Sequence, residues 1–109
     1  MARGKWGENL AATWYLRNGW RVIGRNVRNG HGEIDIIATK DNVVAVVEVK
    51  ARRSAAFGSP AEAITRDKQR AVRSTAFRWA AEHGVPVRRL RFDVVCITGV
   101  AIDVMFDAF

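Results

Sequence analysis

The sequence has few of the residues that mark disulfide-rich, zinc-binding or membrane proteins. Of its 109 residues, only one is cysteine and two are histidine. A single cysteine cannot form an internal disulfide, and no His or Cys stands at zinc-site spacing. No run approaches the ~18 apolar residues of a membrane span, and the amino terminus lacks the apolar core of a signal peptide. We therefore expect residues 1–109 to form a single cytoplasmic domain without a membrane segment.

Lysine is also scarce. It accounts for four of the 18 basic residues, so the excess over the 11 acidic residues, a net charge of +7, is carried by arginine. Guanidinium groups match phosphate geometry better than ammonium groups do, which favours a nucleic-acid partner, most simply DNA. A soluble protein from an arginine-rich proteome is the alternative. The predicted nucleic-acid contacts are Arg52, Arg53, Arg66, Lys68, Arg70 and Arg73.

Hydrophobic periodicity and turn residues predict the element order α-β-β-β-α-β-β. The first helix covers about 5–18 and the second about 60–83, with a capping box at Ser59–Glu62 and a joint near Thr65. A first strand at 20–27 precedes a hairpin over 32–53 that turns at Lys40-Asp41-Asn42, and two strands follow at 91–97 and 100–105. Because a helix joins the third strand to the fourth, those two should be parallel. This is an α/β chain with a mixed sheet flanked by helices.

The hairpin carries charged residues inside runs of valine and isoleucine. Glu33 and Asp35 lie in its first strand, and Glu48 and Lys50 in its second. Ionised groups in a buried strand cost several kcal/mol unless they are paired or bound to a metal. A tight turn at the polar break sets Asp35 opposite Glu48 and Glu33 opposite Lys50, with all four side chains on one face. A one-residue slip would separate them.

This patch has the chemistry of a magnesium site. Hard divalent cations such as Mg²⁺ or Mn²⁺ prefer carboxylate oxygens, which Asp35 and Glu48 supply, and the carbonyl of Val49 is a further candidate. Lys50 could stabilise charge that develops on a phosphate or orient an attacking water. The alternative is an ion-pair ladder from Glu33 to Lys50 without metal.

The first helix supplies one more candidate ligand. Glu8 lies at the edge of its apolar face, where it either extends the acidic patch or is a first-turn acid stabilised by the helix dipole. The residues of that apolar face are Trp6, Leu10, Ala11, Trp14 and Tyr15.

The second helix presents two further groups of side chains. Its apolar stripe, projected backwards, passes between Lys68 and Gln69, which should therefore sit over the sheet. Arg66, Arg70 and Arg73 form a separate stripe, suited either to phosphate or to solvent.

These motifs together resemble a known group of nucleases. Asp35 followed by Glu48-Val49-Lys50 resembles the PD-(D/E)xK signature, with Ile34 where that signature has proline. The predicted order resembles the restriction-endonuclease-like αβββαβ core, here with an added C-terminal strand, and the helical Glu8 resembles that of archaeal Holliday-junction resolvases. Over nearly the whole chain the pattern resembles the YraN family of small bacterial nuclease-like proteins. The matching segments are Gly7-Glu8, Ala11, Tyr15-Leu16, Gly19, Asn26, Gly32–Asp35, Val47–Lys50, Lys68 and Arg91–Val95.

The resemblance implies roles for individual residues. It implies Glu8, Asp35 and Glu48 as metal ligands and Lys50 as the catalytic lysine. Gln69 would be the supporting catalytic residue on the following helix, with Lys68 as the other candidate. The family motif at Arg91 and Asp93 has no assigned chemistry, and we predict a structural ion pair there.

The predicted function is that of a magnesium- or manganese-dependent endonuclease. It would hydrolyse phosphodiester bonds in DNA, in particular branched or structured DNA. The alternative is a non-catalytic nucleic-acid-binding module that retains the nuclease fold, and a third reading is a structural protein with a charged hairpin. A homodimer is an open option, because cutting two strands needs two sites.

Overall fold

The computed structural model describes residues 3–52 and 60–109; Arg53 and Ser59, named above as a contact and a cap, lie outside these ranges. The order of helices and strands is the predicted one, and the joint predicted near Thr65 is present. Thr65 caps the second helix, accepting a 3.1 Å hydrogen bond from the N–H of Lys68. The elements are α1 (Arg3–Arg17), β1 (Arg21–Asn29), β2 (Gly32–Lys40), β3 (Val43–Arg52), η1 (Pro60–Ala63), α2 (Arg66–His83), η2 (Val87–Arg89), β4 (Leu90–Thr98) and β5 (Ala101–Met105).

The five strands form one mixed sheet in the order β1-β2-β3-β4-β5. β2 and β3 are antiparallel and turn at Asp41, whose φ of 54° is the left-handed conformation that Asx residues tolerate. β3 and β4 are parallel, as the intervening helix requires. The predicted hairpin register is confirmed along the ladder from Lys40↔Val43 to Ile36↔Val47.

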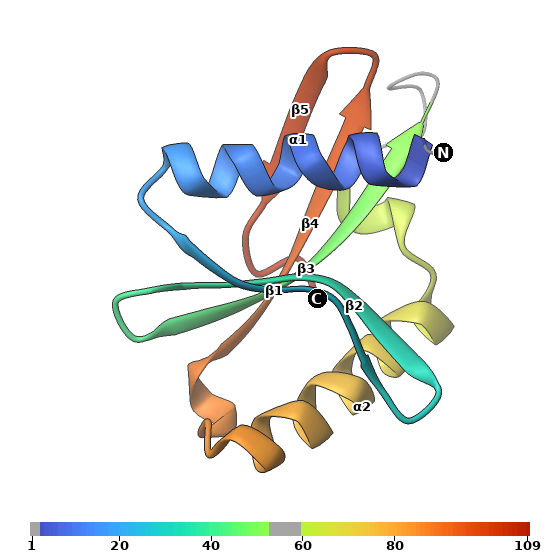
Figure 1. The fold of residues 1–109 in the computed structure, drawn as a ribbon. Helices are drawn as coiled ribbons and strands as arrows, with labels where there is room; N and C mark the ends of the chain where they lie inside the picture. The colour runs from blue at the N-terminus through green and yellow to red at the C-terminus, as the bar shows by residue number, and fades with distance from the viewer. Residues whose placement is uncertain (1–2, 53–59) are drawn as a thin grey trace.

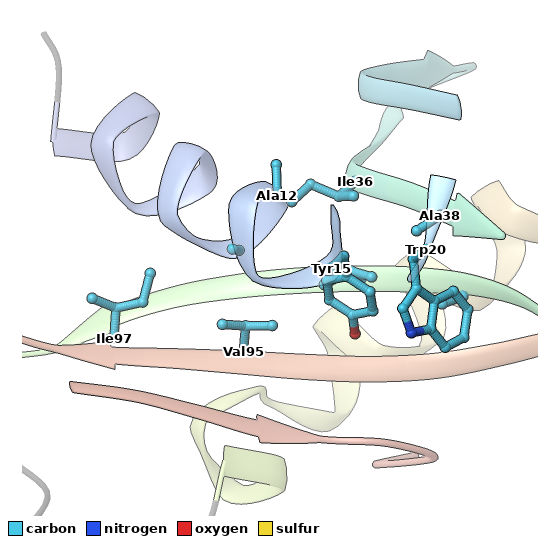
Figure 2. Close-up of a cluster of buried hydrophobic side chains, with 10 residues drawn as sticks. Ala12, Tyr15, Trp20, Ile36, Ala38, Val95 and Ile97 are labelled. Atoms are coloured by element: carbon cyan, nitrogen blue, oxygen red, sulfur yellow. The ribbon is translucent and has the colours of Figure 1, made fainter. Parts of the chain in front are cut away.

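The two long helices cover opposite faces of the sheet (Figure 1). On one face α1 buries Ala11 and Tyr15 against residues of the strands, among them Val95 and Ile97 (Figure 2). On the other face Val72, Ala76 and Trp79 of α2 pack over β2 and β3. Neither helix, among the residues described, is long and apolar enough to span a bilayer.

The prediction that Trp6 is part of the apolar face of α1 is wrong, because this side chain is 48% exposed. Gly7 is the residue that meets the sheet at this end of α1. A Cβ built there would lie 3.5 Å from Ile97 and 3.7 Å from Val49, so the backbone itself approaches the strands closely. That close approach leaves no room for an indole between helix and sheet.

The inward–outward alternation of β2 breaks at Asp35. Ile36 packs under α1, yet Ile34, two positions away, packs under α2 together with Ile37. Residues two apart in a regular strand share a face, so the strand is locally twisted between 34 and 36. Opposite this point, between the pairs Arg25↔Ile36 and Val27↔Ile34, Asn26 of β1 has a φ of 51°. The twist directs the start of β2 away from β3.

A buried polar cluster ties α1 to β4. The Tyr15 hydroxyl donates a 2.8 Å hydrogen bond to Asp93, whose side chain is fully buried. Arg91 donates twice to Asp93, each time at 2.9 Å, and the N–H of Asp107 donates a third bond at 3.0 Å. The Arg91 guanidinium lies over the rings of Trp20 and Phe106. The predicted structural ion pair between Arg91 and Asp93 is confirmed.

Candidate acidic site

The candidate site lies where β2 and β3 diverge. Asp35 and Glu48 stand one position beyond the last ladder pair, Ile36↔Val47, so they continue the predicted register. Figure 1 shows the two strands separating at the right of the view, between the amino-terminal ends of α1 and α2. In this gap Asp35 accepts a 2.8 Å hydrogen bond from the N–H of Val49 on the neighbouring strand. The predicted use of the Val49 carbonyl as a ligand stays a prediction.

Glu48 is the most deeply buried acid of this pair, with a side chain 3% exposed. Its Oε1 lies 3.7 Å from Nζ of Lys68, which reaches down from the first turn of α2. Its Oε2 is buried and has no hydrogen-bond partner in the part of the chain that the structure describes. A buried carboxylate oxygen without a partner is costly and marks a place where a cation or a donor fits.

The electrostatics of the pair favour protonation or a bound cation. Burial raises the pKa of Glu48 to about 8, and the negative charge of Asp35 adds to the rise. Burial likewise raises the pKa of Asp35 to about 6, although the hydrogen bond from Val49 acts in the opposite direction. The positive charge of Lys68 lowers both pKa values without cancelling these effects. A divalent ion would replace the protons and stabilise both ionised carboxylates.

A hollow of about 350 Å³ opens over this pair. Lys50 lines it as predicted, one strand position after Val49, and Lys68 lines it from the helix. Two ammonium groups therefore border two carboxylates, the combination expected where an anion and a cation are held together. The lining residues are Asp35, Glu48, Val49, Lys50, Ala63, Ile64, Thr65 and Lys68.

Glu8 lies near this hollow but does not join the pair. Its charge raises the pKa of Asp35, and its Oε1 is buried and lies 3.8 Å from Arg25 of β1. No group of three Asp, Glu, His or Cys side chains within residues 3–52 and 60–109 is arranged to hold one metal ion. Asp35 and Glu48 thus form a two-carboxylate site. Mg²⁺ fits such a site, since it is usually bound by one or two carboxylates with waters and substrate phosphate.

The structure separates some of the predicted residues from this site. Gln69 donates a 3.1 Å hydrogen bond to the carbonyl of Ile64 and lines a neighbouring hollow together with Arg66, Arg70 and Arg73. Arg52, at the end of β3, is close enough to Cys96 for its charge to act on the thiol pKa.

The predicted position of Glu33 opposite Lys50 is wrong. Glu33 pairs with Arg28 of β1, at 3.6 Å and in the register Arg28↔Glu33. The reason is the twist at Asp35, which takes the start of β2 out of the ladder with β3. The ion-pair ladder considered as an alternative is therefore not formed between these residues.

Sequence reasoning missed two contacts of the site, namely the Val49 amide on Asp35 and Arg25 beside Glu8. The signal that could have indicated the local twist is Asn26, a poor strand residue that tolerates left-handed φ.

Residues 7–97 match the family described as Uncharacterised protein family UPF0102. The chain belongs to the UPF0102 family. A UPF0102 protein of Rhodococcus jostii is 44% identical over 97 residues, which cover 89% of this chain and 82% of the relative. One from Renibacterium salmoninarum is 45% identical over 94 residues, covering 86% and 80%, and one from Desulfosudis oleivorans is 43% identical over 96 residues, covering 88% and 78%. The names of these relatives state no activity.

For this UPF0102 protein, the similarity confirms the family and the fold confirms the α/β class with a mixed five-stranded sheet and two long helices. The matched residues 7–97 include both acids of the hollow and both lysines. What the hollow does is therefore a question for its chemistry.

Proposed function

We propose that this UPF0102 protein is a metal-dependent nuclease that hydrolyses phosphodiester bonds of DNA, and that its fold is a restriction-endonuclease-like αβββαβ core. The observation that carries the proposal is the buried pair Asp35 and Glu48. Its charges are not neutralised by Lys68, and Oε2 of Glu48 has no hydrogen-bond partner among the described residues. The parallel pairing of β3 with β4 across α2 supports the fold assignment.

Asp35 and Glu48 would hold the ion, for which we name Mg²⁺ or Mn²⁺. When bound, the ion supplies Lewis-acid polarisation of the phosphate and a more acidic water. The chain itself positions the reaction. The Val49 amide fixes the Asp35 carboxylate, and the β3 backbone places Lys50 at the rim of the hollow, where its ammonium can stabilise charge on the scissile phosphate.

A cleavage assay tests this proposal. Single-stranded, duplex, flap and four-way-junction DNA are incubated with the protein in magnesium, in manganese or in chelator. We expect cleavage only with metal, and loss of at least about a hundredfold in rate in Glu48→Gln and Lys50→Gln. The matched control is Asp41→Asn, which removes one acid from the other end of the same hairpin and keeps a residue that tolerates its left-handed φ. Equal rates in wild type and Glu48→Gln would refute the proposal.

One observation favours a second function, a non-catalytic nucleic-acid-binding module. Lys68 already provides a cation beside Glu48, and the described residues contain no three-ligand group for a metal. Such a module binds DNA with an affinity that falls steeply with salt but does not depend on magnesium or on Asp35→Asn. Binding measured with and without chelator therefore separates the two functions.

A further inference from the structure

A second hollow, of about 290 Å³, opens on α2 and is lined by Arg66, Gln69, Arg70 and Arg73. The three arginines stand at positions i, i+4 and i+7, so their side chains lie on one stripe of the helix. Arg70 has an acidic neighbour, Asp67, at 3.4 Å, but that carboxylate is 94% exposed and such a contact is weak. The hollow therefore concentrates positive charge on a concave surface.

Two contacts hold the walls of this hollow in place. The guanidinium of Arg73 lies 5.2 Å from the ring centroid of Phe109, which in turn stacks on Phe92 of β4. The amide of Gln69 donates to the carbonyl of Ile64 at 3.1 Å. An arginine held on an aromatic ring loses less conformational freedom on binding a phosphate than one that is free in solvent.

The same contacts place this arginine hollow next to the acidic hollow. Ile64 and Thr65 line the acidic hollow, while Gln69, bonded to Ile64, lines the arginine hollow. Lys68 faces one hollow and Gln69, the next residue, faces the other. The two hollows are thus on neighbouring sides of one helix, within a helix diameter of about 10–12 Å. A nucleic-acid strand advances about 3.4 Å per nucleotide, so this distance corresponds to about three nucleotides.

We propose that the arginine hollow is a phosphate subsite for the strand whose phosphodiester lies at the acidic hollow. It holds a backbone phosphate of that strand about three nucleotides away and so sets the shortest strand that binds well. The subsite rests on the proposed function, because it assigns the scissile phosphate to Asp35 and Glu48. Its ligand is the sugar–phosphate backbone, which carries no base sequence.

The test compares the double variant Arg66→Gln/Arg70→Gln with Arg17→Gln/Arg88→Gln, which removes the same charge from the end of α1 and from η2. Arg73 is left in place because it packs on Phe109. Substrates are single-stranded DNA of increasing length, from a dinucleotide to about ten nucleotides. KM is measured with magnesium, and the dissociation constant with chelator over a range of salt concentrations.

We expect the wild-type KM to fall as the strand grows past about three nucleotides beyond the cleaved bond. Arg66→Gln/Arg70→Gln should lose this gain, with a KM for long strands roughly tenfold higher, an unchanged KM for the dinucleotide and a salt slope smaller by about one. The control variant should keep the length dependence of the wild type.

A length dependence and salt slope identical in the double variant and the wild type would overturn the subsite and leave the nuclease standing. The opposite failure is also distinguishable. If no DNA is cleaved by the wild type while binding of long strands still depends on Arg66 and Arg70, the nuclease is refuted and the phosphate-binding hollow is supported.

Discussion

The N–H of Val49 donates a 2.8 Å hydrogen bond to Oδ2 of Asp35 across the gap where β2 leaves β3. The ladder between these strands ends at Ile36↔Val47, so a side chain takes up the next amide of β3 in place of a backbone carbonyl. This bond fixes Asp35 beside Glu48 while leaving space between the strands. The site is therefore a consequence of strand divergence as much as of the acids themselves.

The stability of the protein should depend on pH through Glu48. Its pKa is raised from 4.5 to about 8 on folding, so the unfolded chain loses this proton first as the pH rises. The free energy of unfolding should consequently fall between about pH 4.5 and pH 8. Glu48→Gln should flatten this fall and stabilise the protein at pH 8 by on the order of 2 kcal/mol, measured by urea unfolding. A slope as steep in Glu48→Gln as in Asp41→Asn and wild type would contradict this assignment.

Magnesium or manganese should stabilise the metal-free protein. An ion at about a hundred times its dissociation constant contributes about 2.7 kcal/mol, which a thermal melt detects as a Tm increase of several °C. Asp35→Asn and Glu48→Gln should each remove most of that increase, whereas Asp41→Asn should keep it. The increase should be larger at pH 8 than at pH 6, because binding displaces protons from both acids. A Tm increase that survives in Asp35→Asn/Glu48→Gln would place the ion elsewhere.

The two lysines of the acidic hollow should have different roles. Lys68 lies 3.7 Å from Glu48 and competes with a bound cation, so Lys68→Gln should tighten magnesium binding severalfold. Lys50 lines the hollow and should act on the phosphate. Lys50→Gln should lower kcat by about a hundredfold or more at saturating magnesium and DNA. Calorimetry for the metal and single-turnover kinetics for the DNA measure the two effects. The reverse pattern would exchange the roles of these residues.

The polar cluster around Asp93 should be important for stability. Tyr15→Phe removes one donor and should cost about 1–3 kcal/mol in the free energy of unfolding. Asp93→Ala should cost more, about 3–5 kcal/mol, because it leaves the Arg91 guanidinium without its carboxylate. Burial and the charge of Asp93 raise the pKa of Tyr15, so the phenol should stay protonated in alkaline solution until the protein unfolds. Spectrophotometric titration of Tyr15, the only tyrosine, measures this directly.

Gly32, at the start of β2, should tolerate no side chain. A Cβ at this position would lie 1.8 Å from Oγ1 of Thr75 on α2. Gly32→Ala should therefore destabilise the protein by about 1–3 kcal/mol, and adding Thr75→Ala should recover part of that loss. Urea unfolding of both single variants and the double variant gives the coupling energy. A coupling energy of zero would show that the strand shifts and avoids the contact.

Local sequence signals were sufficient for the hairpin. The turn at Asp41 and Asn42 sets the register, and two β-branched runs of similar length leave few alternative pairings. The parallel pairing of β3 with β4 follows from the intervening helix alone. These features depend on residues close in sequence or on a general rule of chain connection.

Other features depend on contacts between distant segments and could not be predicted. The divergence of β2 from β3 involves Asn26 on a third strand and a helix that touches Gly32. The partners of Glu48 and Glu8, namely Lys68 and Arg25, come from elements whose relative placement no periodicity encodes. Alternation along one strand assumes a continuous ladder, and it failed for Glu33 where the ladder ends.

The parallel pairing of β3 with β4 has a consequence for the order of folding. β1, β2 and β3 are joined by short turns and can pair early, whereas pairing Val44 with Leu90 requires α2 and its flanking segments to be in place. Glu48 lies on β3, opposite Val94 of β4, and meets Lys68 of α2. The acidic pair therefore stays in water while the early meander forms. It is buried only when the crossover closes, so a metal ion would stabilise the last step of folding and bind only weakly to the states before it.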